Sequence, residues 1–122
     1  MALILIVDDS PTEVHQMKTI LEAAGFRVET AADGDEAIRK ARALLPNLIL
    51  MDIVMPGMDG FRATRALSND PKTRSIPVIM VSSKSQESDV VWGMRQGAVD
   101  YLVKPVSASR LREKAQAALP AG

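Results

Sequence analysis

Short apolar runs alternate with stretches of helical periodicity along the chain, and this alternation limits the possible folds more than any other feature. The strand-like runs are residues 3–7, 26–31, 48–51, 77–81 and 100–103. The stretches with a helical period are residues 11–25, 35–45, 61–67, 87–98 and 107–119. Strands and helices that alternate with short links predict an α/β fold, in which helices cover both faces of a parallel sheet.

Three of the strand-like runs, residues 3–7, 48–51 and 77–81, carry no polar residue. A strand that faces water on one side alternates between polar and apolar residues, whereas a parallel strand covered on both faces does not. The sequence therefore predicts a doubly wound sheet. In such sheets functional residues gather beyond the carboxyl ends of the strands.

Composition excludes several classes of protein. A chain of 122 residues that is 47% hydrophobic fits one globular domain over residues 1–122. Lys plus Arg and Asp plus Glu number 15 each, so no excess of positive charge is available to bind nucleic acid. The absence of Cys removes disulfides, thiol nucleophiles and thiolate metal sites. The apolar N-terminal run is too short to span a bilayer, so we expect a cytoplasmic protein without a membrane segment.

Polar side chains follow four of the predicted strands. They are Asp8 and Asp9 after the first strand, Asp52 after the third, Ser82 and Ser83 after the fourth, and Lys104 after the fifth. Each of these alone has an ordinary explanation, as a helix cap, a turn residue or a solvated lysine. Because the carboxyl ends of parallel strands meet at one edge of the sheet, these residues together predict a functional site.

The residue types of this group favour phosphoryl chemistry. Clustered carboxylates repel each other and raise at least one pKa unless a cation lies between them. Their oxygen atoms suit Mg²⁺, which is held by a few carboxylates and keeps water for a phosphate. The ammonium of Lys104 and the hydroxyl of Ser82 can contact phosphoryl oxygens. Asp52 could then act as a nucleophile and form an aspartyl phosphate.

With these residues in this order, the chain resembles the CheY-like receiver domain of bacterial two-component response regulators over essentially its whole length. The residues that carry the resemblance are Asp8-Asp9, Asp52 followed by MPGMDG, Ser82 after VIMV, Gly97-Ala98, Tyr101 and Lys104-Pro105. The resemblance implies a flavodoxin-like (βα)5 fold with strand order 2-1-3-4-5. Within the family, the chain is most similar to stand-alone receivers of the PilH type, which belong to the chemosensory-like systems that govern type IV pilus twitching motility.

The resemblance also implies roles at the acidic site. Asp52 would be the phosphoacceptor. Mg²⁺ would be bound by Asp9 directly, by Asp8 through water, by Asp52 and by the backbone carbonyl of Val54.

Four further residues receive roles in the same way. Ser82 would bond the phosphoryl group and Lys104 would pair with it. Phosphorylation would draw Ser82 inward and let Tyr101 rotate into the vacated space. Pro105 would follow a cis peptide bond.

The implied partners are a histidine kinase or histidine phosphotransfer domain and a downstream protein target. No direct contact with nucleic acid or membrane is implied, and the oligomeric state would be a monomer or a weak dimer. The chain ends just after the fifth helical stretch, so we expect no output domain. Signalling would then pass through protein contacts on residues 87–96, 100–103 and 107–119. The protein would not be an enzyme beyond its own aspartyl phosphorylation and dephosphorylation.

Other functions remain to be weighed. A pseudoreceiver would bind proteins without phosphorylation, but it normally lacks one of the acidic or lysine residues that are present here. A phosphate sink would drain a shared kinase instead of sending a signal. A haloacid-dehalogenase phosphatase would need Asp-x-Asp on the first strand, and this chain has adjacent aspartates. An FMN carrier would need a phosphate-binding loop where Asp8 and Asp9 place negative charge.

Two residues of the fourth helical stretch have open roles. Trp92 is the only Trp, and we expect it to fill the core, with a partner anchor as the alternative. Gly93 costs a helix about 1 kcal/mol relative to Ala. Either it loosens the helix at a switch surface or it allows close packing against a neighbour.

Overall fold

Five parallel strands form one sheet in the computed structural model, which describes residues 1–119. The strands are β1 (Leu3–Val7), β2 (Arg27–Ala31), β3 (Leu48–Met51), β4 (Val78–Ser82) and β5 (Asp100–Val103). Their order is β2-β1-β3-β4-β5, and every neighbouring pair is parallel. The predicted fold class and the order 2-1-3-4-5 are both confirmed. The last three residues of the expected domain, 120–122, lie outside the described part.

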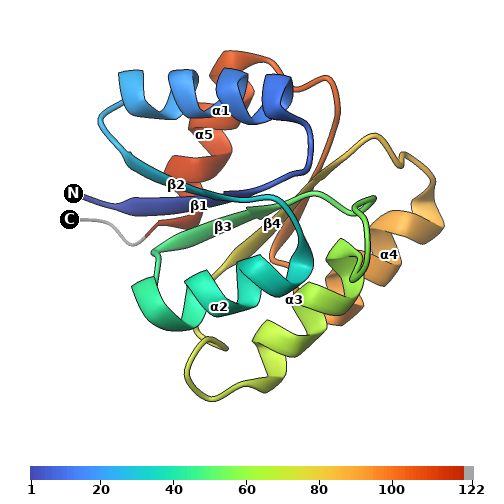
Figure 1. Cartoon of the computed structure of the whole chain (residues 1–122). Helices are drawn as coiled ribbons and strands as arrows, with labels where there is room; N and C mark the ends of the chain where they lie inside the picture. The colour runs from blue at the N-terminus through green and yellow to red at the C-terminus, as the bar shows by residue number, and fades with distance from the viewer. Residues whose placement is uncertain (120–122) are drawn as a thin grey trace.

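Helices cover both faces of the sheet (Figure 1). They are α1 (Pro11–Ala23), α2 (Gly34–Leu44), α3 (Gly60–Asn69), α4 (Glu87–Gln96) and α5 (Ala108–Ala118). Figure 1 shows α1 and α5 on one face and α2, α3 and α4 on the other. The element bounds differ from the sequence prediction by a few residues. One difference matters for the site, because Ser82 is the last residue of β4 and does not lie beyond it.

The core consists of two apolar layers, one on each face of the sheet. Within β1, Ile4 and Ile6 pack on the side of α1 and α5, whereas Leu5 and Val7 pack on the side of α2 and α3. All four side chains are almost completely buried. This two-sided burial explains why the strands show no polar alternation in the sequence.

Helix caps fix where four of the helices begin. The side chains of Ser10, Asp33, Asp59 and Ser107 each accept a hydrogen bond from the backbone N–H three residues later. Such caps satisfy N–H groups that have no partner inside the helix. Because each helix follows a strand, the caps place the helix N-termini at the carboxyl edge of the sheet.

Within residues 1–119, the structure contains no helix with the length and apolar character needed to cross a membrane.

Candidate functional site

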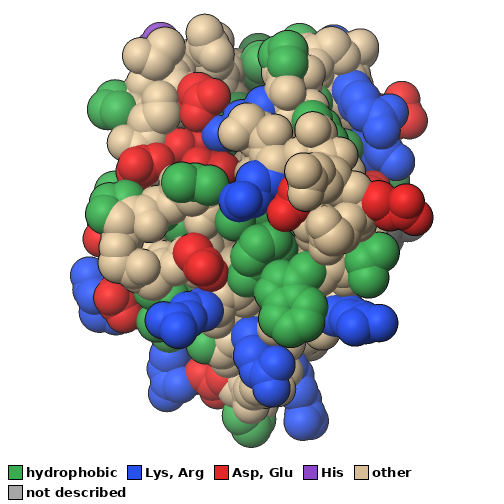
Figure 2. Space-filling view, turned by 90° about the vertical axis from the view of Figure 1, so that its right-hand side faces the viewer, with side chains coloured by type: hydrophobic (Ala, Val, Ile, Leu, Met, Phe, Trp, Pro, Cys, Tyr) green, Lys and Arg blue, Asp and Glu red, His purple; other side chains and the backbone are tan. Residues whose placement is uncertain are grey.

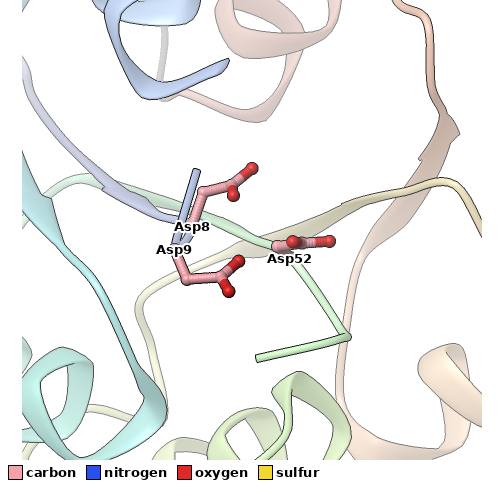
Figure 3. A group of neighbouring side chains, drawn as sticks. All are labelled: Asp8, Asp9 and Asp52. Carbon is pink, nitrogen blue, oxygen red and sulfur yellow. The ribbon is translucent and has the colours of Figure 1, made fainter. Parts of the chain in front are cut away.

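Three aspartates meet at the carboxyl edge of the sheet (Figure 3). Val7 of β1 pairs with Met51 of β3, so Asp8 and Asp52, the residues that directly follow these two strands, lie side by side. One carboxylate oxygen from each of Asp8, Asp9 and Asp52 lies within 4.8 Å of the others. Figure 3 shows the three carboxylates pointing toward the same side, beyond the strand ends. Asp8 and Asp52 are buried, and Asp9 is exposed.

The Lys104 ammonium lies among these carboxylates. Its Nζ is 2.8 Å from Asp8 Oδ2, 2.8 Å from Glu13 Oε2 and 3.5 Å from Asp52 Oδ2. The backbone N–H of Lys104 donates to the carbonyl of Ser82 at 2.8 Å, which ties the residue to the end of β4. The Lys104–Pro105 peptide bond is cis, the geometry that the family resemblance implied.

Burial and neighbouring charge shift the pKa values of two groups. Burial, followed by the charge of Asp8, raises the pKa of Asp52 to about 6, although Lys104 acts in the opposite direction. Burial alone would lower the pKa of Lys104, but its hydrogen bonds to Asp8 and Glu13 outweigh burial and raise it. Lys104 therefore stays an ammonium at neutral pH, and Asp52 is a carboxylate held in an unfavourable environment.

The backbone around Asp52 is fixed by close contacts. The Asp52 N–H donates to the carbonyl of Val7 at 2.9 Å, and Asp52 Oδ1 accepts from the N–H of Ile53 at 2.8 Å. Gly60, the first residue of α3, packs directly on this segment. A Cβ at Gly60 would lie 2.0 Å from the carbonyl oxygen of Asp52, so α3 can begin here only with a glycine.

An open cavity lies beside Asp52. The residues that line it are Glu13, Asp52, Val54, Ser83, Lys104 and Pro105. Ser82 is fully buried at the end of β4, and its Oγ accepts a 3.2 Å hydrogen bond from the N–H of Lys84. The structure thus brings Asp8, Asp9, Asp52, Val54 and Lys104 together. Ser83 lines the cavity, and Ser82, which is expected to bond the phosphoryl group, is the residue before it.

Tyr101 lies on β5, and its buried side chain packs against α4. Its hydroxyl donates a 2.7 Å hydrogen bond to the carbonyl of Lys84, and burial raises the pKa of its phenol. Gly93 makes room for the ring, because a Cβ there would lie 3.3 Å from Tyr101 Cδ2 and 3.4 Å from Met80 Cγ. Of the two interpretations of Gly93, close packing agrees with the structure.

Trp92 does not fill the core, and that expectation was wrong. Its side chain is 48% exposed, and Val91 and Met94 beside it are also exposed. The helix α4 turns Gly93 and Gln96 toward the protein, and Trp92 lies about 100° around the helix from Gly93. Figure 2 shows apolar side chains gathered on this face of the molecule.

Sequence reasoning missed one residue of the site, Glu13. The segment Ser10-Pro-Thr-Glu13 matches the capping-box pattern, in which the Glu side chain binds the N–H of the cap residue. In the structure the Ser10 N–H donates to Asp8 Oδ1 instead, at 2.9 Å. The Glu13 carboxylate binds Lys104. The available signal was its position in the first turn of the helix that follows β1.

The donor set fits a hard divalent cation such as Mg²⁺. Three carboxylates with oxygens within 4.8 Å of one another, two of them on buried residues, leave negative charge that one lysine does not balance. Oxygen-only donors favour Mg²⁺ or Ca²⁺ over softer metals. The side chains that would hold the ion are those of Asp8, Asp9 and Asp52.

Comparison with known proteins gives consistent relatives. The family described as the response regulator receiver domain matches residues 4–116. Protein PilH of Pseudomonas aeruginosa is 52% identical over 119 residues, which cover 98% of each chain. The chemotaxis protein CheY4 of Vibrio cholerae has a similar structure, with a TM-score of 0.92, 34% identity and coverage of 98% of this chain and 99% of CheY4.

A third relative was solved with a metal ion bound. The receiver domain of the sensor histidine kinase PA1611 of Pseudomonas aeruginosa was solved with a magnesium ion coordinated in its active site cleft. It matches with a TM-score of 0.88 and 32% identity, and the match covers 95% of each chain.

Proposed function

This chain belongs to the response regulator receiver family, and we propose that it is a signalling switch that accepts a phosphoryl group on Asp52. The proposal takes residues 1–122 as one receiver domain. One observation carries it above all others. A buried carboxylate with a raised pKa opens onto a cavity between a lysine ammonium and two further aspartates.

Asp52 would be the nucleophile of the transfer. One of its oxygens attacks the phosphorus of a phosphohistidine on a histidine kinase or histidine phosphotransfer domain. A P–O bond forms, the P–N bond breaks, and the imidazole leaves with a proton from solvent. Mg²⁺ bound by Asp8, Asp9, Asp52 and the Val54 carbonyl would supply positive charge that offsets the carboxylates and the phosphoryl oxygens.

Lys104 and the serines would hold the transferred group. The Lys104 ammonium lies 3.5 Å from Asp52 Oδ2, within reach of phosphoryl oxygens on that carboxylate. Ser83 lines the cavity, and Ser82, the residue before it, is the buried last residue of β4. A rotation of the Ser82 hydroxyl toward the phosphoryl group would break its hydrogen bond with the N–H of Lys84.

The switch would reach the surface through Lys84 and Tyr101. Lys84 accepts a hydrogen bond from the Tyr101 hydroxyl, and the Tyr101 ring packs against Gly93 of α4. A shift of the Lys84 backbone would therefore change the surface formed by α4, β5 and α5. Exposed apolar side chains there, including Val91 and Trp92, suit a downstream protein target.

The similarity to PilH supports a role in pilus or chemotaxis-type signalling, and the proposal places the protein in the cytoplasm. The protein would act as a monomer or a weak dimer, without direct contact with nucleic acid or membrane. The alternative outputs are a phosphate sink for a shared kinase and a non-phosphorylated interaction module.

Amide NMR spectra with the phosphoryl mimic beryllofluoride test the switch. In the presence of Mg²⁺, beryllofluoride should shift the amide signals at the ends of β3 and β4 and also those of α4, together with the signal of the Trp92 indole N–H. Asp52→Asn should abolish every shift. Shifts confined to the strand ends would contradict the coupling to α4, and unchanged spectra would contradict the phosphoacceptor site.

A further inference from the structure

Glu13 occupies a position that the receiver chemistry does not explain. It is the third residue of α1, and it lies on the wall of the cavity beside Asp52. Its carboxylate oxygen lies 2.8 Å from the Lys104 ammonium. We propose that Glu13 is a positioning residue that competes with the phosphoryl group for Lys104 and so weakens phosphoryl binding at Asp52.

The Lys104 ammonium lies closer to Asp8 and Glu13 than to Asp52. Two carboxylates hold the ammonium at 2.8 Å, from Asp8 and from Glu13, while Asp52 is farther away at 3.5 Å. Lys104 therefore makes its short contacts away from the phosphoacceptor. The ammonium has three N–H donors, and these two carboxylates accept two of them. One N–H is left for a phosphoryl group on Asp52, and a second becomes available only if Asp8 or Glu13 releases it.

The Glu13 side chain does not cap α1, although its position in the helix would allow it to. The Glu13 N–H donates a hydrogen bond to Ser10 Oγ at 3.3 Å. The Ser10 N–H donates to Asp8 Oδ1 at 2.9 Å and is therefore not available to the Glu13 carboxylate. The Glu13 side chain consequently has no part in capping the helix. Its carboxylate binds across the fold to a residue 91 positions later in the sequence, so its role lies in the site.

Glu13 also adds negative charge near Asp52. Glu13 adds a fourth carboxylate to the group of Asp8, Asp9 and Asp52 around Lys104, and its charge also acts to raise the pKa of Asp52. An anionic phosphoryl group that enters the cavity beside Asp52 meets Glu13 at its wall. The Glu13 side chain is 42% exposed, so solvent screens its effect, and the competition changes affinity by a modest factor.

This inference rests on the proposed function, and the experiment separates the two. The dissociation constant of beryllofluoride is measured at a fixed Mg²⁺ concentration, by NMR titration, for the wild type, Asp52→Asn and Glu13→Gln. The Gln side chain keeps the shape of Glu but loses the charge that holds the ammonium. Glu13→Gln should bind beryllofluoride roughly two- to fivefold more tightly than the wild type, the factor for an ion pair of up to about 1 kcal/mol.

Two matched variants separate competition for Lys104 from a general effect of charge. Glu22→Gln makes the same change of charge on the same helix, about 13 Å farther along its axis, and should bind as the wild type does. Glu13→Asp keeps the charge but shortens the side chain by one methylene, which removes its contact with Lys104. Glu13→Asp should therefore also bind more tightly than the wild type.

A second readout needs neither Mg²⁺ nor beryllofluoride. In the wild type, hydrogen exchange of the Lys104 ammonium protons with water should be slow, because carboxylates hold them. The exchange should be faster in Glu13→Gln and unchanged in Glu22→Gln. A residue that only stabilised α1 would lower the urea midpoint without changing these rates.

Equal or weaker binding by Glu13→Gln, with normal binding by the wild type, would overturn the competition and leave the proposed function intact. Binding by the wild type that matches Asp52→Asn would overturn the proposed function, and this inference with it.

Discussion

The hydroxyl of Tyr101 donates a hydrogen bond of 2.7 Å to the backbone carbonyl of Lys84. The N–H of Lys84 in turn donates to Ser82 Oγ at 3.2 Å. The backbone of one residue therefore links the buried end of β4 to an aromatic ring that packs against α4. Because both side chains bind the backbone of Lys84, we expect movement of Ser82 and movement of Tyr101 to be coupled through that residue.

Tyr101→Phe should weaken this link, because it removes the hydroxyl but keeps the aromatic ring that packs against α4. We expect a loss of about 1 kcal/mol in the free energy of unfolding, the usual value of one hydrogen bond. We also expect faster hydrogen exchange at the Lys84 amide. Thr73→Val serves as the control, since it removes a 2.8 Å bond to the Leu67 carbonyl far from the site. Both variants should lower the urea midpoint, but only Tyr101→Phe should change exchange at Lys84. Unchanged exchange there would contradict the link.

Gly60→Ala should be strongly destabilising. Its Cβ would lie 2.0 Å from the Asp52 carbonyl oxygen, and backbone cannot move aside as a side chain does. We expect a loss of about 3 kcal/mol or more in urea unfolding, the upper range for overpacking. Gly57→Ala is the comparison, because Gly57 has a φ of 73° but no atom near its Cβ position. It should cost only about 1 kcal/mol, from backbone strain. Equal losses would contradict the packing of α3 on the Asp52 backbone.

Removing Asp9 should abolish the response of stability to Mg²⁺. An ion that binds only the native state stabilises it by about 2.7 kcal/mol at a hundred times its dissociation constant. Added Mg²⁺ should therefore raise the Tm of the wild type, as measured by differential scanning fluorimetry. Asp9→Ala should show no rise, whereas Asp35→Ala, which removes an exposed carboxylate of α2, should respond as the wild type does. A normal Mg²⁺ response in Asp9→Ala would show that the ion binds elsewhere.

Asp52→Asn should stabilise the metal-free protein. The pKa of Asp52 is raised from its usual 3.8 to about 6, so the native state disfavours the charged form. The destabilising effect of Asp52 is absent below pH 3.8, grows as the pH rises toward 6 and is complete above 6. Asn does not titrate, so the variant should gain about 1–3 kcal/mol at pH 7 in EDTA. Urea unfolding of the wild type and of Asp52→Asn, measured at several pH values, tests this. A difference in the free energy of unfolding that is the same at every pH would contradict it.

The strands could be predicted from the sequence because burial on both faces leaves a clear signal. Residues 48–51 and 100–103 were predicted with the bounds that the structure has. The acidic cluster could also be predicted, because the parallel topology brings the strand ends to one edge. The proximity of Asp8, Asp9 and Asp52 could therefore be predicted without knowledge of side-chain geometry.

Contacts between distant elements could not be predicted in this way. Glu13 matched a local capping pattern, and only the three-dimensional structure shows that Asp8 takes its place at Ser10. Trp92 was expected in the core, whereas α4 packs Gly93 against Tyr101 and leaves Trp92 exposed. The sequence alone does not state which face of a short helix its neighbours will cover.

The intact mass of the protein after incubation with acetyl phosphate tests the central claim most directly. The wild type and Asp52→Asn are compared with Mg²⁺ and with EDTA. We predict that the wild type gains the mass of one phosphoryl group only with Mg²⁺, and that Asp52→Asn gains none. A phosphoryl group on Asp52→Asn, or no gain by the wild type in Mg²⁺, would contradict the assignment of Asp52 as the phosphoacceptor.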